Sequence, residues 1–314
     1  MRNRARSDLA YIQEERASMN TFLDPPRLPT IDLSLFDIGD PWRDHVAAQV
    51  DWAASTFGLF QILGHGVDPV LIDTLLDLGG KYIALEERAH GRGAEQLADL
   101  PGFHDTVGEY TTTMTGLGHK LMTAMARGLR LDDSFFVDRY SGNPVTSLRI
   151  REYPVGRTRL AGISAPAVPA LRTKLTGIPA GGVPTAGTPA SSTRLDAAAD
   201  RGLLTIVKLG ESEGQQVFFD GQWIDVPALP SALLCYVGPV LERLTQGHYV
   251  SAAHRLSPGD ARSRPSLSFE FEPASDAVLA PVAGVRSRVG GWEARPVAAM
   301  TWRTAADSSR HRPG

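Results

Sequence analysis

A carboxylate, an imidazole and a guanidinium with a nearby hydroxyl occur in order along the second half of the chain. Asp200 lies just before an apolar run, and His254 lies near the end of another patterned segment. Arg264 and Ser266 follow shortly afterwards. A carboxylate and an imidazole on neighbouring strands can share a divalent metal, and an arginine beside a hydroxyl can bind a carboxylate. Together these residues predict most of a metal site of two histidines and one carboxylate (a facial triad), next to a site for an organic acid.

Each of these residues alone has an ordinary structural explanation. Asp200 before a strand is typical of a turn residue. A lone histidine such as His254 is more often a satisfied structural side chain than a ligand, and a lone arginine is usually a surface charge. It is the order and spacing of the whole set that favour the chemical interpretation.

The elements that must position this set are predicted from hydrophobic periodicity. The first half favours strands at 28–33 and 57–63 and helices at 44–55, 69–85 and 106–129. The second half favours strands at 147–153, 203–208, 216–219, 222–226, 232–237, 249–256 and 266–271. Asp220-Gly221 suits a tight hairpin turn. This order predicts a mainly β fold with N-terminal helices, of the double-stranded β-helix (jelly roll) class.

Composition excludes several function classes. The 314 residues suit one large domain or two small ones, and a formal net charge of -3 gives no reason to expect nucleic acid. Cys235 is the single cysteine, which favours a buried apolar role in a reduced, cytoplasmic setting. No stretch suits a membrane span or a secretory signal. We expect a small-molecule substrate and no membrane partner, and the oligomeric state stays open.

Six segments in one consistent order carry a family resemblance. They begin at Leu28, Phe57, Leu148, Asp200, Leu241 and Arg264. They resemble P-x-I-D-L, G-F-F-x-I-x-N-H-G-V, L-R-x-x-x-Y-P, the tail of H-x-D-x-G-L-L-T, L-x-x-x-T-N-G-x-Y-x-S-x-x-H-R-V and R-x-S-x-x-F-F-x-x-P. The chain therefore resembles the isopenicillin N synthase-like group of Fe(II) oxygenases, which includes many 2-oxoglutarate-dependent enzymes.

The resemblance implies a chemistry and roles for particular residues. It implies Fe(II), with 2-oxoglutarate and O2 as co-substrates, and hydroxylation, desaturation or cyclisation of a small molecule, as in secondary metabolism and antibiotic biosynthesis. Asp200 and His254 take the places of iron ligands. Arg264 and Ser266 would hold the far carboxylate of 2-oxoglutarate, and Tyr153 would help to orient that molecule.

One expected iron ligand is missing. The family's first histidine should lie two residues before Asp200, where this chain has Ala198. A methyl group cannot bind a metal, so we expect activity to be impaired or lost. Three origins of Ala198 stay open: natural degeneration, replacement of a ligand histidine, or a designed sequence that kept the fold without the site.

No other histidine is a convincing replacement for the missing ligand. The candidates are His45, His65, His90, His104, His119, His248 and His311. On a regular strand His248 would lie about 20 Å from His254, too far to share one metal. His65 lies in a Gly-His-Gly-Val turn, which is a structural position.

These departures support a second hypothesis of a different class. The chain would be a catalytically silent oxygenase-fold protein that binds a small carboxylic acid or acts as a structural partner. A cupin-like binding module explains less, because it accounts neither for the N-terminal helices nor for Arg264-Pro265-Ser266.

The predicted organisation is one oxygenase domain with flanking segments. The parts are an extension at 1–27 with Met1 and Met19 as alternative starts, the domain at 28–280, and a C-terminal segment at 281–314. Within the domain, 28–140 should form the helical and strand part and 145–275 the jelly-roll core. The Gly-, Ala- and Pro-rich segment 156–195 is predicted as a long loop rather than an interdomain linker.

Overall fold

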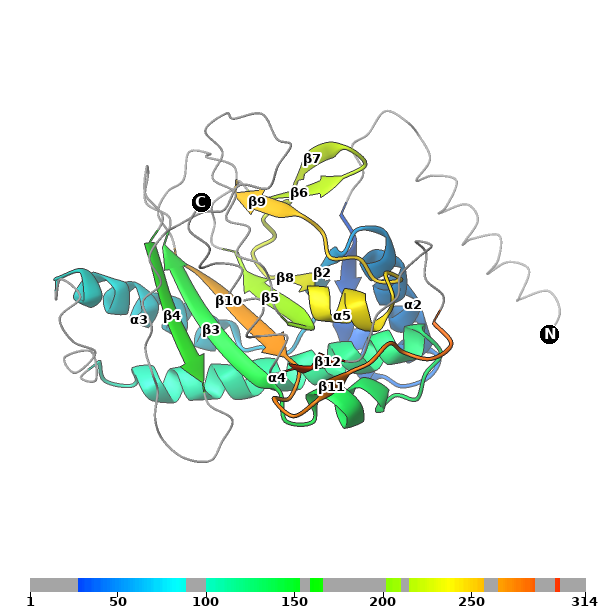
Figure 1. Cartoon of the computed structure of the whole chain (residues 1–314). Helices are drawn as coiled ribbons and strands as arrows, with labels where there is room; N and C mark the ends of the chain where they lie inside the picture. The colour runs from blue at the N-terminus through cyan, green and yellow to red at the C-terminus, as the bar shows by residue number, and fades with distance from the viewer. Residues whose placement is uncertain are drawn as a thin grey trace, which may run out of the picture.

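The structure of the chain is a computed structural model. It describes residues 28–88, 100–152, 159–165, 202–209, 215–256, 265–285 and 297–299. Figure 1 shows long helices on one side of a large sheet and a small sheet on the other side. The predicted extension at 1–27, most of the predicted loop at 156–195 and most of the C-terminal segment lie outside the described residues.

The first part of the chain alternates strands and helices. Its elements are β1 (Thr30–Asp32), the 3-10 helix η1 (Leu33–Asp37), α2 (Trp42–Thr56), β2 (Leu59–Leu63), α3 (Pro69–Arg88), α4 (Phe103–Gly128) and the π-helix η3 (Val137–Ser141). In α4 the apolar residues Met114, Leu117 and Leu121 recur at helical spacing and are buried. The predictions of two strands and three helices in this part are confirmed.

The second part is rich in strands, as predicted. Its elements are β3 (Val145–Glu152), β4 (Arg159–Ala165), β5 (Leu204–Lys208), β6 (Gln215–Phe219), β7 (Gln222–Asp225), β8 (Leu233–Val237), α5 (Pro239–Leu244), β9 (His254–Leu256), β10 (Pro265–Glu272), β11 (Val278–Leu279) and β12 (Val297–Ala298). The β6–β7 turn has φ angles of 47° at Asp220 and 79° at Gly221. The Asp-Gly hairpin prediction is therefore confirmed.

Two predictions in this part are wrong in detail. Strand β4 lies inside the predicted loop at 156–195, because it pairs along its length with β3. Such pairing is a tertiary effect that composition does not reveal. The strand predicted at 249–256 is limited to His254–Leu256, because the backbone N–H of Val250 donates to the carbonyl oxygen of Ala54 in α2 and not to a neighbouring strand. Pro239, at the first position of α5, was the available signal for that helix.

Seven strands form the large sheet in the order β1-β2-β8-β5-β10-β3-β4. The pair β1–β2 is parallel, and the other pairs in this sheet are antiparallel. A three-stranded sheet has the order β7-β6-β9, and β11 pairs with β12. The described strands thus form a β-rich fold with N-terminal helices and two facing sheets, without a closed barrel.

The two faces of the large sheet differ in chemistry. The helix face, toward α3 and α4, contributes these residues to the main core: Leu148, Ile150, Leu204, Ile206, Cys235, Leu267, Phe269 and Phe271. The alternate residues form the opposite face, which we call the inner face. There Leu59, Leu234 and Tyr236 pack against Val217 of the small sheet. Cys235 is fully buried, which raises the pKa of its thiol and fits the predicted apolar role.

Two glycines allow the helices to lie close to the sheet. A Cβ at Gly118 of α4 would lie 2.6 Å from Cδ2 of Phe271, and a Cβ at Gly79 of α3 would lie 2.8 Å from Cδ1 of Ile150. Ordinary contact between carbon atoms needs about 3.5–4.0 Å. The two helices therefore approach β10 and β3 this closely only because these positions carry no side chain.

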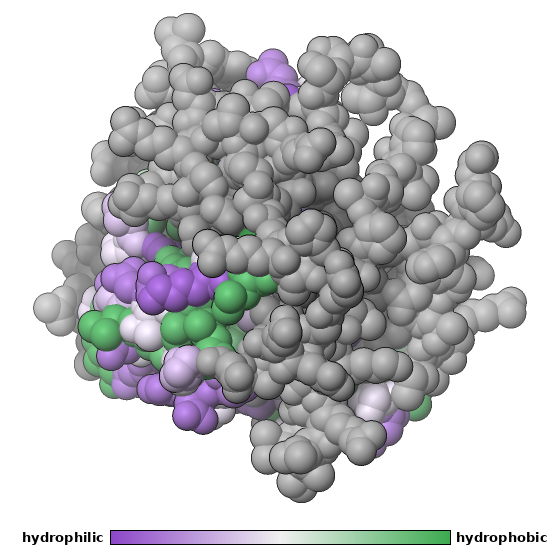
Figure 2. Space-filling view, turned by 90° about the vertical axis from the view of Figure 1, so that its left-hand side faces the viewer, coloured by the Kyte–Doolittle hydropathy of each residue, from purple (hydrophilic) through white to green (hydrophobic). Residues whose placement is uncertain are grey.

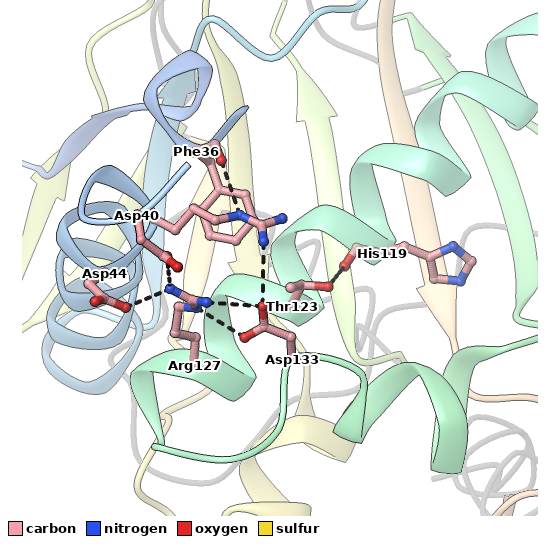
Figure 3. A network of polar contacts seen from close by, with 8 residues as sticks. Phe36, Asp40, Asp44, His119, Thr123, Arg127 and Asp133 are labelled. Atoms are coloured by element: carbon pink, nitrogen blue, oxygen red, sulfur yellow. Dashed lines mark hydrogen bonds and ion pairs between the residues drawn. The ribbon is translucent and has the colours of Figure 1, made fainter. Parts of the chain in front are cut away.

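A polar cluster joins α2 and α4 on the helical side of the molecule (Figure 3). Arg127 donates from Nη1 to Oδ1 of Asp44 at 2.7 Å and from Nε to Oδ1 of Asp133 at 3.0 Å, and it also pairs with Asp40. The hydrogen bond with Asp133, first of all, raises the pKa of Arg127. Asp40 and Asp44 are largely exposed, so this cluster is expected to add little stability.

The described surface is of an ordinary mixed kind. Figure 2 shows green apolar and purple polar patches side by side on the coloured part of one face. Such mixing is normal for a folded chain. In the described ranges, every helix is too short or too polar to cross a lipid bilayer.

Candidate functional site

His254 is a predicted iron ligand that the structure describes. It opens β9, where its backbone pairs with Val217 of β6. Its ring lies 4.2 Å from the ring of Tyr236, centroid to centroid, with a tilt of 33°. Because Tyr236 belongs to the inner face, His254 lies between the small sheet and the large sheet.

A backbone carbonyl orients the His254 imidazole. Nδ1 lies 3.3 Å from the carbonyl oxygen of Ala252. In the tautomer that donates from Nδ1, Nε2 carries the lone pair with which a histidine binds a metal, and this support is usual for ligating histidines. The arrangement fits the role predicted for His254.

Ser266 lies on the same side of the sheet as His254. It is buried, and its partner across the ladder is Arg151 of β3. Residues of a strand alternate between faces, so Ser266 shares the inner face with Ser268 and Glu270. The structure thus brings Ser266 and His254 to one side of the large sheet, as a shared site requires.

The remaining predicted site residues lie outside the described residues: Tyr153, Ala198, Asp200 and Arg264. Within the described ranges, no three His, Cys, Asp or Glu side chains come together as a metal-binding group. A three-ligand site at His254 therefore has to draw on residues outside those ranges, where Asp200 lies. The roles of Asp200, Arg264 and Tyr153 stay predictions.

His119 is on the wrong side of the sheet to replace the missing ligand. Its Nε2 lies 2.6 Å from the carbonyl oxygen of Ser141, and its ring meets Phe271 edge-on at 5.4 Å. Phe271 belongs to the helix face, so the sheet separates His119 from His254. Figure 3 shows His119 on α4, joined through its carbonyl to Thr123.

Other described histidines have structural contacts of their own. Nε2 of His248 lies 2.9 Å from Oδ1 of Asp51 on α2. Nδ1 of His65 accepts a hydrogen bond from the Val67 N–H at 3.1 Å, and its Nε2 lies 3.2 Å from the Ser231 carbonyl oxygen. His45 on α2 lies edge-on to the Trp42 ring, and His104 on α4 lies next to the Phe103 ring. His90 and His311 lie outside the described residues.

The inner face also carries a buried ion pair that was not among the predicted site residues. Nη1 of Arg149 lies 2.6 Å from Oε1 of Glu270, and Nη2 donates to Oε2 at 3.0 Å. The Ser147 hydroxyl also donates to Oε2, at 2.8 Å. The sequence could have indicated this polar face through the alternation along β10, where Ser266, Ser268 and Glu270 interrupt an otherwise apolar run.

Two family models match parts of this chain and identify its family. A model described as the 2OG-Fe(II) oxygenase superfamily matches residues 182–273. A second model, described as the N-terminal region of non-haem dioxygenases in morphine synthesis, matches residues 28–96. The chain belongs to the 2OG-Fe(II) oxygenase superfamily. The family uses Fe(II) and 2-oxoglutarate, and the predicted family resemblance is confirmed.

Individual relatives of this chain are distant. It is 26% identical to a flavonol synthase/flavanone 3-hydroxylase of Arabidopsis thaliana, over 86% of this chain and 83% of the relative. It is 24% identical to a 1-aminocyclopropane-1-carboxylate oxidase of Musa acuminata, over 82% of this chain and 86% of the relative. These relatives act on different molecules, so their names do not select a substrate.

Solved structures share the fold of this chain. A full-length Neurospora crassa protein in complex with alpha-KG superposes with a TM-score of 0.68 at 16% identity, covering 88% of this chain and 95% of that chain. The rice dioxygenase for auxin oxidation gives a TM-score of 0.65 at 19% identity, covering 92% and 97%. At this identity the likeness establishes the fold alone.

Proposed function

We propose that this chain is an Fe(II)- and 2-oxoglutarate-dependent oxygenase of a small molecule. Asp200 and His254 would hold the iron, Arg264 and Ser266 the far carboxylate of 2-oxoglutarate, and Tyr153 would orient that molecule. The observation that carries the proposal is His254, which lies between the two sheets with Nδ1 turned to a backbone carbonyl. Bound iron and 2-oxoglutarate supply the oxidising chemistry, and the protein supplies geometry and a water-poor setting.

Ala198 sets the level of activity in this proposal. With alanine at this position, Asp200 and His254 are the two side-chain ligands. Loss of a group that only supports a metal ligand costs about 10–100-fold in affinity or activity. Loss of a direct ligand should cost more, so we expect weak iron binding and little or no turnover in the chain as it stands.

The substitution Ala198→His tests whether only the ligand is missing. With Fe(II) and 2-oxoglutarate under anaerobic conditions, the variant should show a stronger visible charge-transfer band than the wild-type chain. With O2 it should convert 2-oxoglutarate to succinate. Ala199→His is the matched control, because it adds the same imidazole on the adjacent residue. A variant without a band or succinate would contradict the proposed metal site.

Ala198 also favours a second candidate function, that of a silent binder of a small carboxylic acid. In that case 2-oxoglutarate should bind without metal, and Arg264→Ala should abolish this binding in a calorimetric titration. Ala198→His should then bring no succinate formation. Unchanged 2-oxoglutarate binding in Arg264→Ala would count against the predicted carboxylate pocket under both functions.

A further inference from the structure

The ion pair between Arg149 and Glu270 lies in one row with the site residue His254. On the inner face, Glu270 of β10 is opposite Thr205 of β5, and Thr205 is opposite Tyr236 of β8. Two strand spacings therefore separate Glu270 from Tyr236, which is about 10 Å. His254 stacks on Tyr236. The ion pair thus lies within the reach of a small molecule from His254, on the same side of the large sheet.

The polar half of the inner face contrasts with its apolar half. The apolar cluster between the two sheets takes its large-sheet members from β2, β5 and β8. On β10 and β3 the inner-face positions include instead Ser147, Arg149, Ser268 and Glu270. A buried ion pair seldom adds stability over apolar residues of similar volume, because both charges lose water. Stability alone therefore gives no reason for charges at these positions.

The two members of the pair have different access to other molecules. The Glu270 side chain is 2% exposed and already accepts from Arg149 and from Ser147. The Arg149 side chain is 16% exposed. In the described contacts it uses two of the five N–H groups of a guanidinium, both toward Glu270. Arg149 is thus held rigidly by Glu270 while it keeps donors for another acceptor.

We propose that Arg149, held by Glu270, which also accepts from Ser147, binds a carboxylate of the molecule that this chain oxidises. The substrate class is then an organic acid. A guanidinium whose fork is fixed in advance loses little side-chain entropy when it binds a planar carboxylate. The assignment of this carboxylate to the substrate rests on the proposed function, in which Arg264 and Ser266 hold 2-oxoglutarate instead.

Benzoate and benzamide are suitable probes because they have the same shape and differ in charge. Both are titrated by calorimetry into the full chain with 2-oxoglutarate at saturation. A hydrogen bond to a charged group contributes about 1.5–3 kcal/mol, which is about 10–100-fold in affinity. We expect benzoate to bind more tightly than benzamide by that factor. Equal affinities, or no benzoate binding, would overturn the proposal.

Two substitutions separate this site from the 2-oxoglutarate site. Arg149→Met should remove the preference for benzoate and keep 2-oxoglutarate binding. Arg264→Met should remove 2-oxoglutarate binding and keep the preference for benzoate. If benzoate binding survives Arg149→Met, the inference fails while the proposed function stands. If 2-oxoglutarate binding is indifferent to Arg264→Met, the proposed function fails at that residue.

A double variant guards against a folding defect. Arg149→Met alone leaves the Glu270 carboxylate buried without its cation, which can unfold the chain. The variant Arg149→Met/Glu270→Leu removes both charges and should fold. It should bind benzoate and benzamide equally. A benzoate preference in the folded double variant would show that Arg149 does not bind the carboxylate.

Discussion

On the helix face of the large sheet Phe269 and Phe271 are fully buried, and on the inner face Ser268 and Glu270 are almost as buried although they are polar. The four residues alternate along one strand, β10, so they share the same backbone and the same neighbouring strands. What differs is what each face meets. The helix face meets α3 and α4, and the inner face lies on the side of His254 and the small sheet.

This difference separates the residues that specify the fold from those that serve the site. An apolar residue at a buried position follows from the hydrophobic effect alone. A polar residue at an equally buried position costs free energy unless it is paired, so its presence calls for another reason. Glu270 meets this criterion with Arg149 as its partner, whereas Phe271 needs no further explanation. Among equally buried residues, the polar ones therefore indicate the site, whereas burial alone does not.

The largest effect is expected on the helix face, from Phe271→Ala. Its ring packs against Gly118 of α4 and meets His119 edge-on. The cavity left by truncation should lower the free energy of unfolding by about 3–5 kcal/mol, measured by urea denaturation. Val278→Ala is the control, because Val278 is an exposed apolar residue, and it should change stability by no more than about 0.5 kcal/mol. A cost under about 1 kcal/mol for Phe271→Ala would remove the contrast between the faces.

The ion pair should respond differently to single and double substitution. Glu270→Leu leaves the Arg149 guanidinium without its carboxylate and should cost about 2–3 kcal/mol of unfolding free energy. Arg149→Met/Glu270→Leu should recover most of that loss, because replacement of both charges by apolar groups is often neutral. Urea denaturation of the four proteins of this cycle gives the coupling energy. A double variant whose cost equals the sum of the two single costs would give a coupling energy of zero, and the two side chains would then not depend on each other.

Helix packing gives the next largest effect. Substitutions of two nearby glycines in α4 should change the stability of the chain in opposite directions. Gly118→Ala places a methyl group against Phe271 and should destabilise the chain by about 1–3 kcal/mol. Gly116→Ala lies two residues earlier in α4, where a Cβ meets nothing within 4 Å. It should stabilise the chain by about 0.5–1 kcal/mol, because alanine favours the helix over glycine. Equal effects on the thermal midpoint would show that α4 does not depend on the close approach at Gly118.

The helix face was largely predictable from the sequence, and the inner face was not. Periodicity is a local property, so it predicted α2, α3, α4 and most strands. It did not predict β4, which depends on pairing with β3. The Arg149–Glu270 pair joins residues 121 positions apart, so its existence follows only from the register of β3 and β10. The polar positions on β10 were visible in the sequence, but their partners were not.

The residues of the candidate site also differ in how far the sequence and the structure support them. His254 was predicted from its motif, and its place over Tyr236 adds the physical support that a motif lacks. Ser266 was predicted as well, and it lies on the inner face with the ring of Tyr236 that His254 contacts. Asp200, Arg264 and Tyr153 stay predictions from the resemblance, because they lie outside the described residues. That Ala198 takes the place of an iron-binding histidine also stays a prediction from the resemblance.

The smallest effect is expected at the end of β2, where His65 is a structural histidine in contrast to His254. Burial, first of all, lowers the pKa of His65 below its usual 6.5, and the hydrogen bond to Ser231 opposes this only in part. Its Nδ1 accepts from Val67, which also favours the neutral ring. Below about pH 6.5 the unfolded chain therefore takes up a proton that the folded chain resists. This contribution to stability is complete above that pH and is lost as the pH falls toward the folded-state pKa.

The measurement compares urea midpoints at about pH 8 and about pH 5.5, on either side of the ordinary histidine pKa. On acidification the urea midpoint of His65→Gln should fall less than that of the wild-type chain. Glutamine takes up no proton, so the unfolded variant gains no proton at position 65 that the folded variant resists. If His65→Gln also keeps the full drop, the neutral His65 does not contribute to acid sensitivity. The contrast between the structural His65 and the proposed ligand His254 would then have to rest on His254 alone.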